Sequence, residues 1–225
     1  MEHLNVIVVG AGLSGIAAGH YLSNDCPWAD YAILEGREAM GGTWDLFRYP
    51  GLRSDSDMFT LGYSFRPWDG AKSIADGDSI LRYVRETAAE EGIDGKIRYG
   101  HRIVAANWST ENARWTVQVE RSGSDDPTTL TCDFLFSCTG YYRYDHGYTP
   151  DFPGMDTFGG TVVHPQHWPD DLDVTGKRAV GIGSGATAIT LLPTLAHHPE
   201  HRTKLQRTPS YLHPRRGTTP PGDRA

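Results

Sequence analysis

A glycine-rich turn near the N-terminus limits what this chain can fold into more than any other feature. The β-branched run 5–9 predicts a short buried strand, and the sequence GAGLSG follows it where a helical pattern begins. Gly10 permits a tight turn, Gly12 lets the backbone approach a pyrophosphate, and Gly15 allows the helix to pack closely on the strand. The pattern is typical of the first turn of a dinucleotide-binding unit.

The next predicted strand strengthens this interpretation. The buried run Tyr31–Glu35 ends on an acid, about 20 residues after the last glycine of the turn. An acid at this place binds ribose hydroxyl groups. Strand, turn, helix, second strand and acid therefore predict a Rossmann-like unit at the start of the chain.

A second glycine-rich turn follows the predicted strand 179–182, and it allows two registers. GIGSGA would use Gly181, Gly183 and Ala186, whereas GSGATA would use Gly183, Gly185 and Ala188. We prefer the second register because it leaves the preceding strand at full length.

The end of the following strand separates the two units. Where the first unit has Glu35, the second has Gln206, Arg207 and Thr208. A cation there can pair with a 2′-phosphate, which indicates NADP rather than NAD. The alternative is that Arg207 is an ordinary surface residue.

The segments between the two turns complete the predicted fold. They are a stretch without regular structure at 41–59, an amphipathic helix at 78–92, paired strands at 96–108 and 114–120, and a buried strand at 133–140. The fold class is α/β, with two Rossmann-like dinucleotide-binding units, the second incomplete, and a small antiparallel β insertion. The opposite charges after the second strands imply two different dinucleotides, and a flavin dinucleotide on the first unit with NADPH on the second would allow hydride transfer between them. The expected domains are therefore an FAD-binding domain at 1–150, a linker at 151–176, the N-terminal part of an NADP-binding domain at 177–212, and a disordered tail at 213–225.

Composition excludes several functions. The 225 residues carry a formal net charge of -7, which argues against nucleic acid or an anionic membrane as partner. No apolar run reaches the roughly 18 residues of a membrane span, and no signal peptide is evident. Three cysteines provide no disulfide framework, so we expect a cytoplasmic protein. His197, His198 and His201 have no supporting acid or cysteine cluster, so we expect no metal site.

The linker contains FGGTVVHPQHWP at 158–169, and this segment points to a family. Its residues Phe158, Gly160, His164, Trp168 and Pro169 match the fingerprint of the class B flavoprotein monooxygenases of the Baeyer–Villiger type. The stretches GGTWDLFRYPGLRSDSDMF, HPQHWPDDLD and IGSGATA resemble the ethionamide-activating branch of that family. The resemblance covers residues 5 to about 212.

The resemblance implies site residues. His164 and Trp168 would couple the two domains, and Asp55 would be a catalytic residue that pairs with an arginine for which this sequence has no counterpart. The implied FAD contacts are Gly10, Ala11, Gly12, Ser14, Gly15, Glu35, Gly42, Thr43, Trp44, Asp55 and Ile103. The implied NADP contacts are Arg53, Ser54, Gly183, Ser184, Gly185, Ala186, Thr187, Ala188, Arg207 and Thr208.

The implied function is an FAD- and NADPH-dependent monooxygenase. It would use dioxygen and a peroxyflavin to oxidise ketones in the Baeyer–Villiger manner, or to oxygenate a thioether, thioamide or amine. We expect the chain to be a C-terminally truncated member of the family. Two alternatives stay open: a non-catalytic remnant or dinucleotide-binding module, and an NAD(P)H–flavin reductase without coupled oxygenation.

Overall fold

The computed structural model describes residues 1–197 and 200–212; the tail predicted at 213–225 lies outside the described residues. The chain divides into two units. One consists of Met1–Asp45 and Leu81–Tyr141, and the other consists of Leu46–Ile80 and the residues from Tyr142 onward. The domain ranges predicted from the sequence stay a prediction, and each unit is described by itself.

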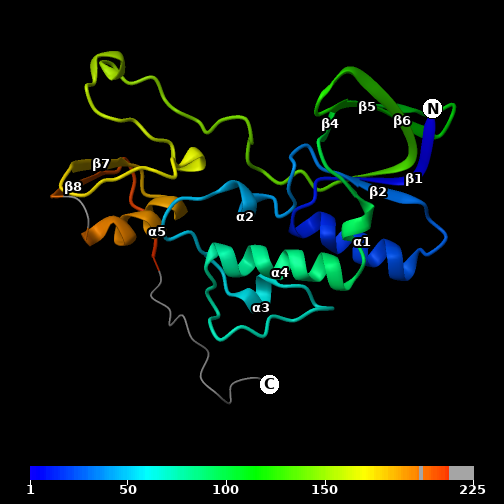
Figure 1. The fold of residues 1–225 in the computed structure, drawn as a ribbon, viewed down its shortest axis with the longest axis horizontal. Coiled ribbons are helices and arrows are strands. Elements are labelled where there is room, and N and C mark those ends of the chain that lie inside the picture. Colours follow the sequence, from blue (N-terminus) through cyan, green and yellow to red (C-terminus); the bar gives the residue numbers. More distant parts are fainter. Residues whose placement is uncertain (198–199, 213–225) are drawn as a thin grey trace. The chain divides into compact units, whose positions relative to one another are not determined.

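A mixed six-stranded sheet forms the first unit (Figure 1). Its strand order is β3-β2-β1-β6-β5-β4, in which β1, β2, β3 and the second half of β6 run parallel, and β4, β5 and the first half of β6 run antiparallel. The mixed α/β, Rossmann-like fold expected from the sequence is therefore confirmed. The strands are β1 (Glu2–Val9), β2 (Tyr31–Leu34), β3 (Ile97–Arg98), β4 (His101–Ser109), β5 (Arg114–Arg121) and β6 (Ser124–Ser137).

Helices α1 (Leu13–Asp25) and α4 (Gly77–Glu90) lie on the same face of this sheet in Figure 1, and the boundary between the units falls within α4. A Cβ on Gly19 of α1 would lie 2.7 Å from Ile93 and 3.3 Å from Ile33, so glycine lets α1 approach β2 closely. The opposite face of the sheet has its own core, in which alternate strand residues interlock. These buried residues are Leu4, Ile7, Ala32, Leu34, Val117, Val119, Leu130 and Cys132.

Strand β6 differs from the prediction, which began this strand at Asp133. It starts at Ser124, because Ser124–Cys132 pairs antiparallel with β5 before the chain continues alongside β1. The predicted antiparallel insertion is thus part of the same sheet as the nucleotide-binding strands. The polar run 124–129 has no strand periodicity of its own, so its pairing with β5 decides its conformation.

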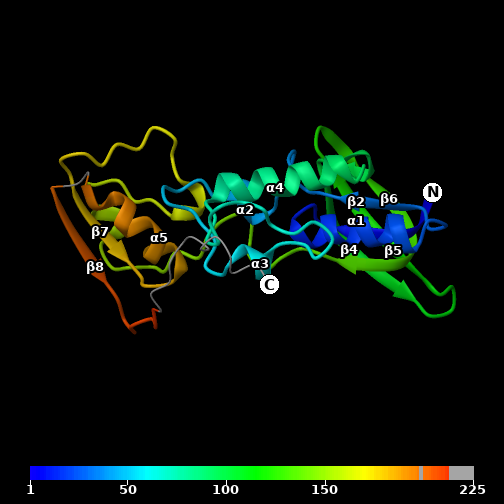
Figure 2. The same cartoon turned by 90° about the horizontal axis from the view of Figure 1, so that it is seen from below.

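The second unit contains a smaller parallel pair, β7 (Arg178–Ile182) and β8 (His201–Leu205), connected through α5 (Ala186–Thr194) (Figure 2). Its core joins Phe47, Tyr49 and Leu191. The helical pattern of the sequence extends to His198, yet α5 ends at Thr194 with Pro193 in its last turn, and a 3-10 turn at Leu195–His197 follows it.

The stretch predicted without regular structure contains two short helices, α2 (Thr43–Leu46) and α3 (Met58–Leu61). Asp57 accepts a hydrogen bond from the amide of Thr60 at 3.1 Å and so starts α3. Four short 3-10 turns complete the described structure: Asp94–Lys96, Met155–Thr157, Pro165–His167 and Leu195–His197. None of the helices in the described part of the chain has the length and apolar character needed to cross a bilayer.

Candidate dinucleotide-binding sites

The first glycine turn has the backbone that its spacing predicts. Gly10 follows β1 with φ +101°, and its amide donates to the carbonyl of Leu34 at 2.8 Å. A Cβ on Gly10 would lie 2.7 Å from the carbonyl oxygen of Cys138, and a Cβ on Gly15 would lie 1.8 Å from the carbonyl oxygen of Gly10. Both positions therefore require glycine, one for conformation and one for space.

Gly12 occupies the N-cap position of α1, where the amides of the first helical turn point at any bound anion. A Cβ on Gly12 would lie 3.5 Å from Cα of Gly42, so two glycine backbones face each other at the start of the helix. Side chains at these two positions would fill the space between them. The residues present therefore fit a dinucleotide pyrophosphate at this turn.

Glu35 is linked directly to the glycine turn. Its side chain is 8% exposed, one carboxylate oxygen accepts from the amide of Ala11 at 2.8 Å, and the other accepts from the amide of Arg37 at 3.0 Å. The amide of Gly41 donates to the carbonyl of Ala11 at 2.9 Å, which brings the turn before Gly42 to the same place. Each carboxylate oxygen of Glu35 retains a lone pair for a ribose hydroxyl.

The first unit thus collects three of the predicted FAD segments: the turn 10–15, Glu35, and 42–44. Ser14 is exposed on α1, and Ile103 of β4 packs against the sheet core. Asp55, also predicted as an FAD contact, is an exposed residue of the second unit.

A buried ion cluster in the first unit was missed by sequence reasoning. Asp45 is 4% exposed, and its two carboxylate oxygens accept from Nη2 of Arg37 at 2.7 Å and from Nη2 of Arg85 at 2.9 Å. Arg37 lies two residues after Glu35 and Asp45 directly follows Trp44, so the cluster joins two predicted FAD segments to α4. The only available signal was an acid placed among apolar and aromatic residues in TWDLF.

The second glycine turn repeats the geometry of the first. Gly183 follows β7 with φ +124°, and its amide donates to the carbonyl of Leu205 at 2.8 Å, as Gly10 does to Leu34. Gly185 is the N-cap of α5 with φ −76° and ψ −172°, close to the −84° and −168° of Gly12. This match favours the register that uses Gly183, Gly185 and Ala188. Thr187 and Ala188 lie in the first turn of α5 after Ala186.

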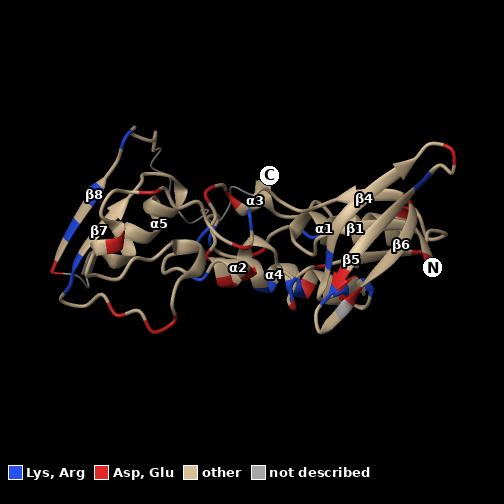
Figure 3. Cartoon of the chain, turned by 90° about the horizontal axis from the view of Figure 1, so that it is seen from above, with Lys and Arg blue, Asp and Glu red and all other residues tan. Residues whose placement is uncertain are grey.

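The end of β8 lies against this second turn. The hydroxyl of Ser184 donates to the carbonyl of Thr208 at 2.9 Å, and the hydroxyl of Ser210 donates to the carbonyl of Ser184 at 2.6 Å. Arg207 is exposed next to these contacts, and Figure 3 shows further lysine and arginine on β8. The structure therefore brings Thr208 to the glycine turn, with Arg207 directly before it in the chain; the 2′-phosphate role of Arg207 stays a prediction.

Arg53 and Ser54 lie on a short backbone ladder of the second unit. The amide of Ser54 donates to the carbonyl of Ala75 at 2.9 Å, and the amide of Ala75 donates to Oγ of Ser54 at 3.1 Å. The backbones of Arg53 and Asp76 form an isolated antiparallel β-bridge. Ser54 is buried, while Arg53 and Asp55 on either side of it are exposed.

Residues of the linker fingerprint make close contacts with neighbouring segments of the second unit. The ring of His164 lies against Gly147, where a Cβ would meet the ring at 2.0 Å, and its Nδ1 accepts from the amide of Gln166 at 3.2 Å. Burial lowers the pKa of His164, and the neighbouring His167 lowers it further.

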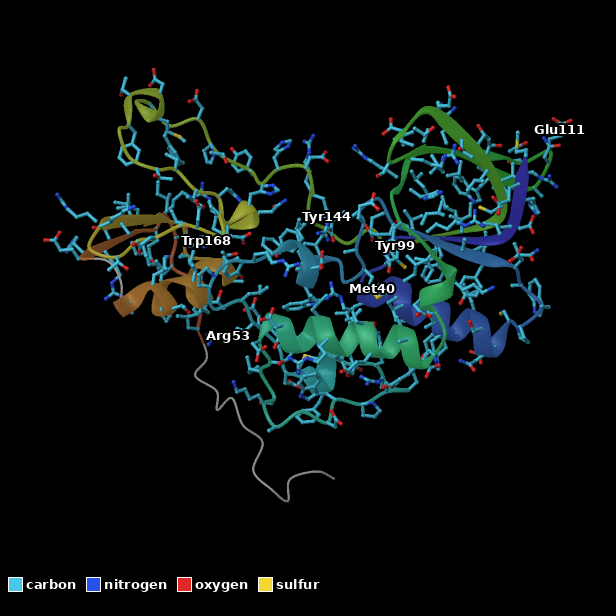
Figure 4. All side chains as sticks on the ribbon, viewed as in Figure 1. Met40, Arg53, Tyr99, Glu111, Tyr144 and Trp168 are labelled. Carbon is cyan, nitrogen blue, oxygen red and sulfur yellow. The ribbon has the colours of Figure 1, made fainter. Side chains whose placement is uncertain are left out.

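Gln166, which sequence reasoning did not single out, is buried and donates to the carbonyl of Arg143 at 2.6 Å. Trp168 packs beside α5 in the core of the second unit (Figure 4).

The cysteines contribute packing. Cys132 is fully buried in the sheet core, and burial raises the pKa of its thiol to about 11. Cys138 is half-buried, and burial also raises its pKa. Within residues 1–197 and 200–212, no group of three or more His, Cys, Asp or Glu side chains is arranged to hold a metal ion.

Comparison with protein families gives two matches. Residues 69–216 match the family described as flavin-binding monooxygenase-like, and residues 8–70 match an NAD(P)-binding Rossmann-like domain. The first match alone covers more than half of the chain.

Individual proteins agree with this result. The chain is 58% identical over 212 residues to the FAD-containing monooxygenase EthA of Mycobacterium tuberculosis and 56% identical to EthA of Mycolicibacterium smegmatis, in each case over 94% of this chain and 43% of the relative. It therefore spans less than half the length of these relatives. The resemblance to the ethionamide-activating branch is confirmed.

Solved structures of monooxygenases share the fold. A steroid monooxygenase bound to NADP matches with a TM-score of 0.81 and 32% identity, over 94% of this chain and 40% of that chain. A cyclohexanone monooxygenase from Rhodococcus sp. Phi1, bound to NADP⁺, matches with a TM-score of 0.78 and 26% identity, over 95% and 40%. With its two glycine turns and its linker fingerprint, this chain belongs to the flavin-binding monooxygenase-like family.

Proposed function

We propose that this chain carries the FAD site and the start of the NADP site of an NADPH-dependent monooxygenase. The observation that supports this most concerns two glycine turns of the same geometry. In each unit the strand after the turn is followed by a charged residue, and the two charges have opposite signs. Glu35 directly follows β2 in the first unit, and Arg207 follows β8 in the second. An acid favours ribose hydroxyls and repels a 2′-phosphate, whereas a cation attracts it.

The residues have distinct roles in this proposal. The amides at Gly12 and the start of α1 hold the FAD pyrophosphate, and Glu35 accepts hydrogen bonds from its ribose. The turn 183–188, Arg53, Ser54, Arg207 and Thr208 hold NADPH. Asp55 orients a cation beside the flavin, while His164 and Trp168 brace the linker between the two sites.

When bound and reduced, FAD activates dioxygen for transfer of one oxygen atom to an organic substrate. A ketone is the Baeyer–Villiger substrate, and a thioether, thioamide or amine is the substrate for S- or N-oxygenation. The chain's own contribution is to hold the dinucleotides, keep water from the flavin and place a negative charge at Asp55.

Two alternative functions would use the same residues. A dinucleotide-binding module would need the two glycine turns without oxygenation. A flavin reductase would need the same two sites and no organic substrate.

The test uses the purified 225-residue chain, its flavin absorbance after desalting, and NADPH in air with a thioether or ketone. We expect substoichiometric FAD, oxidation of NADPH in preference to NADH, and little sulfoxide or ester. Stoichiometric FAD with such a product would exclude the binding module. Stoichiometric FAD with NADPH consumed only to hydrogen peroxide would favour the reductase. A chain that binds neither FAD nor NADP⁺ would contradict the proposal.

An Arg207→Ala variant tests the choice of cofactor within the same experiment. The Kd for NADPH should rise about tenfold while the Kd for NADH changes less than about twofold, because only NADPH carries the 2′-phosphate. Arg202→Ala, an exposed arginine on β8, is the matched control. Equal effects on both cofactors would remove Arg207 from the site.

A further inference from the structure

The segment Phe47–Leu52 packs closely against α5. Gly51 has φ +82°, and a Cβ on it would lie 2.3 Å from Oγ1 of Thr194 and 2.6 Å from the carbonyl oxygen of Thr190. The second of these atoms belongs to the helix backbone, which has no rotamer with which to move aside. Gly51 therefore allows a contact between loop and helix that no other residue would permit.

The contact extends over one face of the helix. Thr190 is 4% exposed, and its Oγ1 is 3.3 Å from the hydroxyl of Tyr49. Phe47, Tyr49 and Leu191 form a buried core, and the rings of Phe47 and Tyr49 meet edge to face with centroids 5.8 Å apart. We name the contact of Tyr49 and Gly51 with Thr190 and Thr194 the α5 seat.

The α5 seat lies between two parts of the candidate NADP site. Arg53 and Ser54 follow Gly51 after a single residue, and the ladder to Ala75 and Asp76 holds them from the other side. The other end of α5 starts directly after its N-cap Gly185, in the second glycine turn. Because a helix is a rigid spacer of about 1.5 Å per residue, the seat determines how far Arg53 lies from that turn.

We propose that Tyr49, Gly51 and Thr190 are positioning residues that hold Arg53 at a set distance from the turn 183–188, and so complete the NADP site. The proposal rests on the proposed NADP role of the second unit. It explains why a loop distant in sequence from α5 has a glycine, a tyrosine hydroxyl and apolar rings that meet one helix face.

The first test compares ligand affinities. Gly51→Ala should weaken NADP⁺ binding at least tenfold, measured by calorimetric titration, while FAD affinity, measured by flavin fluorescence, changes less than twofold. Gly159→Ala is the matched control, because a Cβ there meets no described atom within 4 Å and its φ is not in the left-handed region. Tyr49→Phe removes only the hydroxyl and should weaken NADP⁺ binding two- to fivefold, with the exposed Tyr148→Phe as its control. An equal loss of both affinities, or none, would overturn the proposal.

Hydrogen–deuterium exchange distinguishes this inference from the proposed function. In Gly51→Ala, exchange should rise at least fivefold in both α5 and residues 53–76, and stay unchanged in β1 and α1. This result is expected even if the wild-type chain binds no NADP⁺, which would contradict the proposed function alone. A rise confined to the loop, with α5 unchanged, would show that the seat positions nothing.

Discussion

At the scale of single residues, Asp45 links two predicted FAD segments to α4. Its buried carboxylate meets two guanidinium groups from different segments, and one of these arginines also donates its amide to Glu35. The sequence places Asp45 in a predicted FAD turn, but the residues 37 and 85 that neutralise it come together only through folding. A buried carboxylate with both oxygens in charged hydrogen bonds is costly to disturb.

Replacing Asp45 tests this account. Asp45→Asn should lower the free energy of unfolding by about 1.5–3 kcal/mol, because it removes the charge that two partly exposed arginines share. Urea denaturation measures the change. Glu111→Gln, an exposed charge in the β4–β5 turn, is the control and should change stability by less than about 0.5 kcal/mol. A similarly small effect for Asp45→Asn would show that the cluster is only a surface ion pair.

At the scale of elements, the strand–turn–helix units are the part of the fold with the most local determinants. The backbone after β1 needs a positive φ at Gly10, and α1 needs a missing Cβ at Gly15 to approach it. Other element ends depend on details that periodicity does not carry. For the helix predicted at 78–92, the sequence offers Asp78 as the capping residue. In the structure the helix begins at Gly77, and Asp76 caps it by accepting from the amide of Ser79.

Gly15→Ala tests the packing of α1 on its strand. The added Cβ would lie 1.8 Å from the carbonyl oxygen of Gly10, so helix or turn must shift, and we expect a loss of about 1–3 kcal/mol or more. Thermal and urea unfolding measure it. Gly95→Ala serves for comparison, since its Cβ meets no described atom within 4 Å and the substitution should be neutral or slightly stabilising. Equal stabilities for the two variants would contradict the packing role of Gly15.

At the scale of the whole molecule, the second unit exposes an apolar sheet face. Val180 and Ile182 of β7 point away from α5, Leu205 is paired in register with Ile182, and these side chains are 62%, 65% and 50% exposed. A parallel sheet normally has both faces covered. Exposed β-branched residues on such a pair predict that chains associate with one another through this face.

Ile182→Thr should reduce this association while keeping strand propensity. We expect dye binding to exposed apolar surface to fall by at least half, and sedimentation to lose its concentration dependence. Val162→Thr, an exposed valine outside the sheet, should leave both unchanged. If the Ile182 variant still associates as the wild type does, the face is not the contact surface.

The sequence by itself determined the two glycine turns, the charges that follow their second strands and the family fingerprint of the linker, because each depends on residues close in the chain. A positive φ, an absent Cβ and a charge after a strand each depend on one residue and its near neighbours. The spacing of the glycines and charged residues in the sequence is therefore enough to predict them. Only the tertiary structure decided that β6 joins the parallel and antiparallel halves of one sheet, that Asp45 is shared by two arginines, and that Tyr49 meets Thr190 across 141 positions. These contacts depend on which distant surfaces are buried together, and no local pattern records that choice.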